Sequence, residues 1–586
     1  MLNRFTFGPR PGDVEAVEAQ GPERWFEVQL QPESIPDGNA ESRLAALPSI
    51  RMSPAELIVN YPPNQVLKQI EEGKQAMPGD PQLAAVYATL IDRKQEQQKL
   101  KAMTVPTDAE GEQQQSSQKQ QAAWIAVPLL LKPPPDRYSA ILALPVADRR
   151  ILLEHLRGDL RDRLFDGLNP AQRETLAVMQ YGSGVSETEL QEAKLLRAVY
   201  SERQVLEVMT DFWFNHFNVF LDKGADKYYT GAYERDVIRK HALGKFKDLL
   251  LAVAQSPAML VYLDNASSTG PKSPAGIRNQ RGLNENYGRE LLELHTLGVN
   301  GGYSQQDVTE AARVLTGWTV NRAEAGEYVF MPRRHEPGDK RVLGRVYRND
   351  RDPQQEGIDL LKDLAHRPAT ARFICTKLAR RFVADDPPPQ IVEEMARTFE
   401  GSDGNIRVVL RTMVRSPYFW SREAYRAKFK TPFEFVASVM RATGAEITNA
   451  QPLTAEIGRM GMPLYRMQTP QGYSALSSDW LASNSLLERL NFAMKFTSNG
   501  FGMGYDGRDT LAIALIRRTS QDPTLQAGGK NATVAVLEQT VLGPDVSPQT
   551  RNAVNTGSNE STDTDAKAFL NGIIGLLIGS PDFQHR

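Results

Sequence analysis

Helical periodicity over most of the chain is the feature that most limits its fold. From Trp124 onward, apolar residues recur at the spacing of about 3.6 residues that puts them on one face of an α-helix. Two short segments have a strand-like pattern instead, Tyr328–Met331 and Arg341–Tyr347, and we predict that they pair around a turn at His335–Asp339. The sequence therefore predicts a mainly α, multi-helical protein with one short β-hairpin.

Three helix-to-helix corners share one pattern, in which an apolar helix runs into Ser-Pro. These corners are Ser256-Pro257, Ser416-Pro417 and Ser580-Pro581, at spacings of 160 and 164 residues. Serine caps a following helix and proline suits its first position, so each pair predicts a helix start. The spacing hints at a degenerate helical repeat, but so short a similarity is weak evidence, and repeated use of a good cap is the preferred explanation.

Composition divides the chain into four parts. Residues 1–94 are an N-terminal helical segment with Pro and Gly turns, and residues 95–122 are a Gln-rich linker or insertion with few apolar side chains. A helical core domain over residues 123–520 carries the motifs discussed below. Residues 521–586 form a C-terminal helical segment.

Charge and cysteine content exclude several classes of protein. The 69 Lys and Arg residues nearly balance the 71 Asp and Glu residues, which leaves no electrostatic footprint for nucleic acid. The longest apolar runs, 123–131 and 573–578, fall short of the roughly 18 residues of a membrane-spanning helix. Cys375 is the single cysteine, so one chain builds no disulfide or thiolate metal cage.

Two helices before residue 245 each carry a histidine that the pattern turns inward. Ser201–Gln204 reads as a capping box, and His216 continues the apolar stripe of the helix that follows it. In the helix around residues 233–243, His241 projects between Val237 and Ile238. We expect both imidazoles to face the core.

A third histidine lies in the helix over residues 284–298, which Gly298 ends. The predicted buried arc of this helix is Tyr287, Leu291 and Leu294, with Asn284 and His295 inside or beside it and Glu290 on its border. On the opposite face, Glu285, Arg289 and Glu293 are spaced as a salt-bridge ladder.

These polar residues support two interpretations. Either the histidines are separate core residues, each hydrogen-bonded to a neighbour, or they converge on a pocket as acid–base groups or metal ligands. On the second interpretation Glu290, His295, His216 and His241 are the candidate catalytic residues. Candidate substrate-binding residues are Asn215, Asn218, Asn284, Arg289, Trp318 and Asp264. The histidine spacing matches no metal-binding motif, so we predict no metal site and leave the cofactor unknown.

A set of longer motifs resembles the bacterial domain-of-unknown-function family 1800. They are Asp211-Phe212-Trp213-x-Asn215-His216-Phe217-Asn218-Val219, Ile238-Arg239-x-His241-Ala242-Leu243-Gly244, the segment Asn284–Val299, Gly301-Gly302-Tyr303, Leu315-Thr316-Gly317-Trp318, His335-x-x-Gly338-x-Lys340 and Gly579-Ser580-Pro581-x-Phe583-Gln584. The start, Leu2–Pro9, is similar to the family's usual opening. Two departures are Gly461-Met462, where the family tends to have Gly-Gln, and Gly472-Tyr473, where it tends to have Gly-Trp.

The resemblance implies an exported protein but no established activity. Members are often encoded beside a sulfatase-like family, domain of unknown function 1501, which implies a partner outside the cytoplasm. We therefore expect a periplasmic or secreted protein, with a cytoplasmic location as the alternative.

Two functions follow as hypotheses. The first is a hydrolase or lyase that acts on a carbohydrate-like polymer through Glu and His acid–base chemistry. The second is a non-catalytic binding or assembly partner of the sulfatase-like protein.

Overall fold

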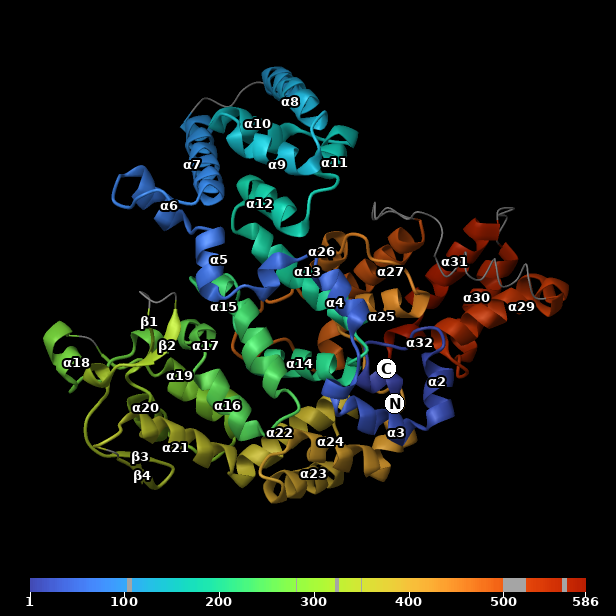
Figure 1. The fold of residues 1–586 in the computed structure, drawn as a ribbon. Helices are drawn as coiled ribbons and strands as arrows, with labels where there is room; N and C mark the ends of the chain where they lie inside the picture. Colours follow the sequence, from blue (N-terminus) through green and yellow to red (C-terminus); the bar gives the residue numbers. More distant parts are fainter. Residues whose placement is uncertain (103–107, 281, 322–325, 349, 499–522, 561–565) are drawn as a thin grey trace. The chain divides into compact units, whose positions relative to one another are not determined.

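The structure, a computed structural model, describes residues 1–586 except 103–107, 281, 322–325, 349, 499–522 and 561–565. Helices dominate it, and the described strands form two small two-stranded antiparallel sheets (Figure 1). The prediction of a mainly α fold with a short hairpin is confirmed.

The chain divides into two compact units, residues 41–193 and residues 1–40 with 194–586. The predicted four-part division stays a prediction. In the smaller unit α10 packs on α7 and α8, which contain the described part of the Gln-rich stretch. Its elements are η2 (Pro48–Arg51), α5 (Pro54–Asn60), α6 (Asn64–Glu71), α7 (Pro81–Ala102), α8 (Asp108–Leu130), α9 (Pro134–Ala143), α10 (Val146–His155), α11 (Asp159–Phe165) and α12 (Pro170–Tyr181).

The larger unit holds the candidate residues and the rest of the fold. Its first half comprises α1 (Leu2–Phe5), α2 (Asp13–Gln20), α3 (Pro22–Gln29), η1 (Pro32–Ser34), α14 (Gln204–His216), α15 (Asp226–Ala232), η3 (Tyr233–Arg239), α16 (Phe246–Ala254), α17 (Pro257–Tyr262), η4 (Asn265–Ser267), α18 (Pro274–Asn279), α19 (Asn286–Glu290), η5 (Leu291–Thr296) and α20 (Gln305–Val314). Helices α4 (Gly38–Leu44) and α13 (Gly184–Tyr200) contain the two points of division.

The second half of the larger unit follows the two small sheets. It comprises η7 (Pro332–Arg334), α21 (Gln354–Ala365), α22 (Pro368–Phe382), α23 (Pro389–Gly401), α24 (Ile406–Arg415), η8 (Pro417–Trp420), η9 (Arg422–Ala424), α25 (Pro432–Thr443), α26 (Gln451–Arg459), η10 (Ser477–Trp480), α27 (Ser483–Thr497), α29 (Pro523–Leu542), α30 (Pro548–Glu560), α31 (Ala566–Gly579) and α32 (Pro581–Gln584). Helices α22, α23 and α24 pack in succession, and α31 packs on α27 and α30.

The predicted pairing of the two strand-like segments is wrong. Strand β2 (Glu327–Phe330) pairs with β1 (Trp318–Asn321), and β3 (Lys340–Val342) pairs with β4 (Arg345–Tyr347). Leu343 and Gly344 join β3 to β4 with φ angles of 49° and 84°, the positive pair of a tight two-residue hairpin turn. The first segment therefore pairs with β1, which precedes it in the chain, and the second folds on itself as β3 and β4, so two hairpins replace the predicted one.

The prolines of the Ser-Pro pairs mark helix starts correctly, but most of the serines do not cap them. Each of the three Ser-Pro pairs begins a helical turn, but only the Ser580 side chain accepts a backbone hydrogen bond, from Phe583 N. The predicted capping box at Ser201 is wrong, because the Ser201 hydroxyl bonds Asp37 and α14 begins at Gln204. The threefold repeat stays a prediction.

Candidate functional site

Two of the three candidate histidines meet in the core of the larger unit. His216 ends α14 and His295 lies in η5, and their ring centroids are 6.3 Å apart. His216 Nε2 is 3.2 Å from the backbone oxygen of His295. The side chains are 1% and 0% exposed, so both are sealed from solvent.

Lys377 of α22 completes this cluster and fixes the form of His216. A carbonyl oxygen only accepts, so His216 Nε2 carries the proton and donates it to His295 O. The other nitrogen, Nδ1, then accepts from Lys377 Nζ at 2.8 Å. This arrangement requires a neutral imidazole beside the lysine.

Burial keeps both imidazoles neutral. It lowers the pKa of His295 from 6.5 to about 3, with the Lys377 charge as the next cause, and it lowers the pKa of His216 well below its ordinary value for the same two reasons. Burial also lowers the pKa of Lys377 to about 8. Near neutral pH the cluster is therefore a charged lysine beside two neutral histidines.

Aromatic rings surround His295, and its polar atoms have no partner among the described residues. The rings of Phe217 and Tyr287 have centroids 5.1 and 6.2 Å from that of His295. Neither nitrogen of His295 has a hydrogen-bond partner, and the hydroxyl of fully buried Tyr287 also lacks one. An unpaired buried polar group costs about 1–3 kcal/mol, so this site is destabilising for the fold.

A π-helix explains which residues of the third motif are buried. After one turn of α19, residues Leu291–Thr296 form η5, which is π-helical. The wider turn, with hydrogen bonds from i to i+5, rotates the buried face relative to a 3.6-residue helix. Leu292 and His295 are consequently buried while Leu294 is half-buried, so the predicted arc was wrong at Leu294.

His241 differs from the other two histidines. It follows the π-helical η3 and is only half-buried, so the prediction that its imidazole faces the core is only partly correct. Burial and the charge of Lys240 lower its pKa, and Asp248 opposes them. The adjacent Ala242 carbonyl accepts from Trp213 Nε1 at 2.9 Å, which ties this turn to α14.

Glu290 lies at a half-exposed polar edge of the same region. Burial and the neighbouring charge of Glu293 raise its pKa. Its charge also helps to raise the pKa of the Tyr262 phenol, although burial is the main cause there. Lys223 Nζ is 2.9 Å from Asp264 Oδ1 and donates to Tyr262 O at 2.5 Å. The structure thus groups Glu290 and Asp264 with two residues that the motif search missed, Lys223 and Tyr262.

Asp226 is a further buried acid that sequence reasoning missed. It is 0% exposed, and neither carboxyl oxygen has a hydrogen-bond partner among the described residues. Burial raises its pKa to about 9, so the carboxyl is protonated at neutral pH. Because an aspartate in the first turn of a helix is usually an exposed stabiliser of the helix dipole, its sequence position gave no signal of burial.

The chain as a whole matches one known protein family. The model of the family described as "Protein of unknown function (DUF1800)" matches residues 1–585. The chain belongs to the DUF1800 family. The resemblance drawn from the motifs is confirmed, and no curated protein and no solved structure matches the chain.

Two asparagines of the first DUF1800 motif hold a loop. Asn215 Nδ2 donates to Tyr473 O at 2.8 Å, and Asn215 Oδ1 accepts from Tyr473 N at 2.7 Å. Asn218 Nδ2 donates to the carbonyls of Met467 and Thr469, each at 2.9 Å. Both side-chain amides therefore donate their hydrogen bonds to the backbone of residues 467–473.

The other candidate binding residues contact partners of their own. Asn284 Oδ1 accepts from Asn286 N at the start of α19, and Arg289 lies 3.5 Å from Glu285. Trp318, on β1, is fully buried against Gly357 of α21, where an added Cβ would lie 2.4 Å from the indole ring. Its indole is thus part of the core.

The DUF1800 motif at His335 forms a second buried polar cluster. His335 Nδ1 donates to Thr316 O at 2.8 Å, and its Nε2 accepts from Lys340 Nζ at 3.0 Å. Lys340 Nζ also donates to Glu356 Oε2 at 2.7 Å. These contacts join β3 to α21. Glu356 had no sequence signal, because it lies outside the motif.

Two kinds of feature are absent from the part of the chain that the structure describes. In that part of the chain no three His, Cys, Asp or Glu side chains are grouped as ligands of a metal ion. Over the same residues no helix is both long and apolar enough to cross a membrane.

Proposed function

We propose that this chain is a non-catalytic binding or assembly protein that works in the periplasm or outside the cell with a sulfatase-like partner. The observation that carries the proposal is the sealing of the histidine pair. A general acid or base needs a pKa near the working pH and contact with its substrate. His216 and His295 have neither, because they are 1% and 0% exposed and burial keeps both neutral.

An apolar groove supplies the surface for a partner. It has a volume of about 600 Å³ and lies between α27, α30 and α31. Leu490, Met494 and Leu576 line it and are 47%, 70% and 42% exposed, and Gly572 and Gly575 of α31 line it as well. None of its described lining residues is charged. This matches the apolar face of a partner helix rather than an ionic or sugar ligand.

The test is binding between the purified chain and a sulfatase-like protein of the family that is often encoded beside DUF1800 members. We expect a complex by sedimentation velocity, and we expect Met494→Glu to weaken it at least tenfold because a charge would enter the apolar groove. Ile277→Glu is the matched control, since Ile277 is 71% exposed elsewhere on the larger unit. No complex at tens of micromolar of each protein would refute the proposal, and so would equal losses in both variants.

A second candidate is a hydrolase or lyase acting on a carbohydrate-like polymer at Glu290. The observation in its favour is that Glu290 is half-exposed and has a raised pKa beside Tyr262, the state expected of a general acid. Reducing-end and unsaturated-product assays on neutral and uronate polysaccharides test it. Activity that Glu290→Gln lowers at least 100-fold, and that Glu285→Gln leaves intact, would replace the assembly proposal.

A further inference from the structure

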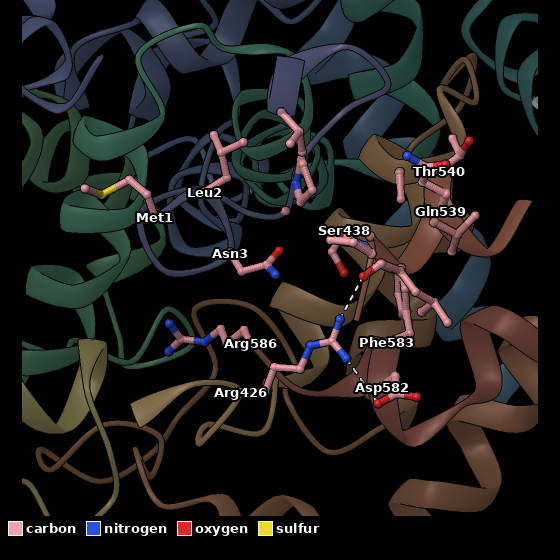
Figure 2. Close-up of a pocket in the computed structure, with 18 of the residues that line it drawn as sticks. Met1, Leu2, Asn3, Arg426, Ser438, Gln539, Thr540, Asp582, Phe583 and Arg586 are labelled. Atoms are coloured by element: carbon pink, nitrogen blue, oxygen red, sulfur yellow. Dashed lines mark hydrogen bonds and ion pairs between the residues drawn. The ribbon is translucent and has the colours of Figure 1, made fainter. Parts of the chain in front are cut away.

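A cavity of about 680 Å³ lies in the larger unit, away from the histidine pair and Glu290. Figure 2 shows Ser438 and Phe583 on its wall, with Gln539 and Thr540 of α29 nearby and Arg426 joined to Asp582. This volume suits a small organic molecule.

Lys430 is a buried cation in this wall without a carboxylate partner. It is 6% exposed, donates to Ser438 Oγ at 3.0 Å and lies 4.0 Å from the ring centroid of Phe583. No carboxylate of the described residues lies within ion-pair distance of its Nζ. By contrast, Lys428, two residues earlier and outside the cavity wall, pairs with Asp385. A buried ammonium without a counter-ion is costly, so its retention at a cavity needs an explanation.

The surrounding charges leave Lys430 in a positive environment. One carboxylate, Glu434, acts on it favourably, while the guanidinium groups of Arg586, Arg426 and Arg489 oppose it. Glu434 is already engaged, 3.1 Å from Arg586 Nε. Burial first, and then these arginines, lower the pKa of Lys430 to about 7, against the attraction of Glu434. A ligand anion would supply the negative charge that the protein lacks here.

A second cation of the wall, Arg4, is also without a carboxylate. It is 9% exposed and donates to the carbonyls of Phe419 and Ala424 at 2.6 and 2.8 Å. Of the lining carboxylates, Asp582 is already paired with Arg426 at 3.1 Å, and Glu15 and Glu18 are exposed, so water and salt screen those two from the interior. The buried part of the cavity is therefore cationic.

Apolar side chains complete the wall. Val17, Leu542 and Phe583 line it and are each less than one tenth exposed. We infer that this cavity binds a small organic acid, with its aliphatic body against these apolar side chains and its carboxylate on the Lys430 ammonium and on the Ser438 hydroxyl. That hydroxyl donates to the Phe435 carbonyl at 3.2 Å in this structure and would turn to the ligand.

Titration calorimetry of the full chain with decanoate, decanol and acetate tests the inference. Decanoate carries both the anion and the aliphatic body, and each of the other two probes carries one of them. We expect saturable binding of decanoate, at least tenfold tighter than that of decanol or acetate. We expect Lys430→Met to weaken decanoate at least tenfold and to leave decanol unchanged.

The variant is designed to stay folded. Methionine has a similar length and no charge, so replacing this unpaired buried lysine should preserve or raise the melting temperature. Lys495→Met is the control, because Lys495 is half-exposed, pairs with Glu456 and lies outside the cavity wall. If Lys430→Met does not fold, Ser438→Ala removes one of the two proposed contacts and should weaken decanoate severalfold.

Three results would overturn the inference. They are no binding of decanoate by the wild type, equal affinity for decanoate and decanol, and full decanoate affinity in both the Lys430→Met and Ser438→Ala variants.

Discussion

Replacing His295 should remove one defined part of the acid sensitivity of the larger unit. Burial lowers the pKa of this imidazole from 6.5 to about 3, so it is neutral in the fold and becomes charged in the unfolded chain as the pH falls. The unfolded state then binds more protons, and stability is lost as the pH drops below about 6.5. Above that pH the contribution of His295 to the pH dependence vanishes.

The size of the effect follows from the two pKa values. Between pH 7.5 and pH 5.0 linkage gives a loss of about 2 kcal/mol from His295 alone. In a unit of this size that corresponds to a fall in melting temperature of about 2 °C. His295→Leu and His295→Gln do not titrate in this range, so both should lack this part of the loss. His295→Leu also removes two unpaired buried nitrogens and should be at least as stable as the wild type at pH 5.0.

Scanning calorimetry of the wild type and both variants at the two pH values makes the comparison. His366→Gln serves as a control, because His366 is exposed and bonds Asp403. The His366→Gln variant should still show the fall in melting temperature that His295 causes in the wild type. If the wild type and His295→Leu lose the same melting temperature between pH 7.5 and 5.0, then His295 is not a sealed neutral imidazole and the reasoning about the cluster fails.

Three further substitutions test other parts of the structure. Burial raises the pKa of Asp226 to about 9, so the protein should lose stability as the pH rises from about 4 to about 9. Calorimetry should show that Asp226→Asn is more stable than the wild type by a few kcal/mol at pH 8 and by little at pH 4. Gly472 has a φ of +75°, and an added Cβ would lie 2.1 Å from the Asn215 carbonyl oxygen. Gly472→Ala should therefore cost at least about 2 kcal/mol in urea unfolding, whereas Gly461→Ala, which has positive φ but open space, should cost about 1 kcal/mol. Lys377→Met removes a charge that lowers the pKa of both core histidines in the fold, which narrows the gap to their unfolded-state pKa, so the pH at which acid destabilises the protein should fall. An unchanged midpoint in an acid titration followed by circular dichroism would contradict this assignment.

The candidate site was predictable only in part. The motifs correctly marked His216 and His295 as core residues on separate helices, and the family followed from the same segments. The side chains that define their chemistry were not visible in the pattern. Lys377 lies 161 residues from His216 and shares no motif with it. Distance along the chain carries no information about which helix packs opposite a histidine.

Local rules failed where a nonlocal partner or an unusual backbone competed with them. Ser201 has the spacing of a capping box, but its hydroxyl bonds Asp37 from the N-terminal segment instead. The 3.6-residue rule misplaced Leu294 because η5 is π-helical. A single sequence gives no signal for the π-turn, since that geometry is held by tertiary packing.

The sequence by itself determined the helical class, the helix starts at Ser-Pro and the helix end at Gly298, because these depend on periodicity and on the backbone preferences of single residues. Tertiary structure decided the protonation of the buried groups. His295 and Asp226 are ordinary titrating residues in the chain, and only the removal of water around them makes both neutral near pH 7. That desolvation is a property of everything packed around a side chain, so it exists only once the fold has formed.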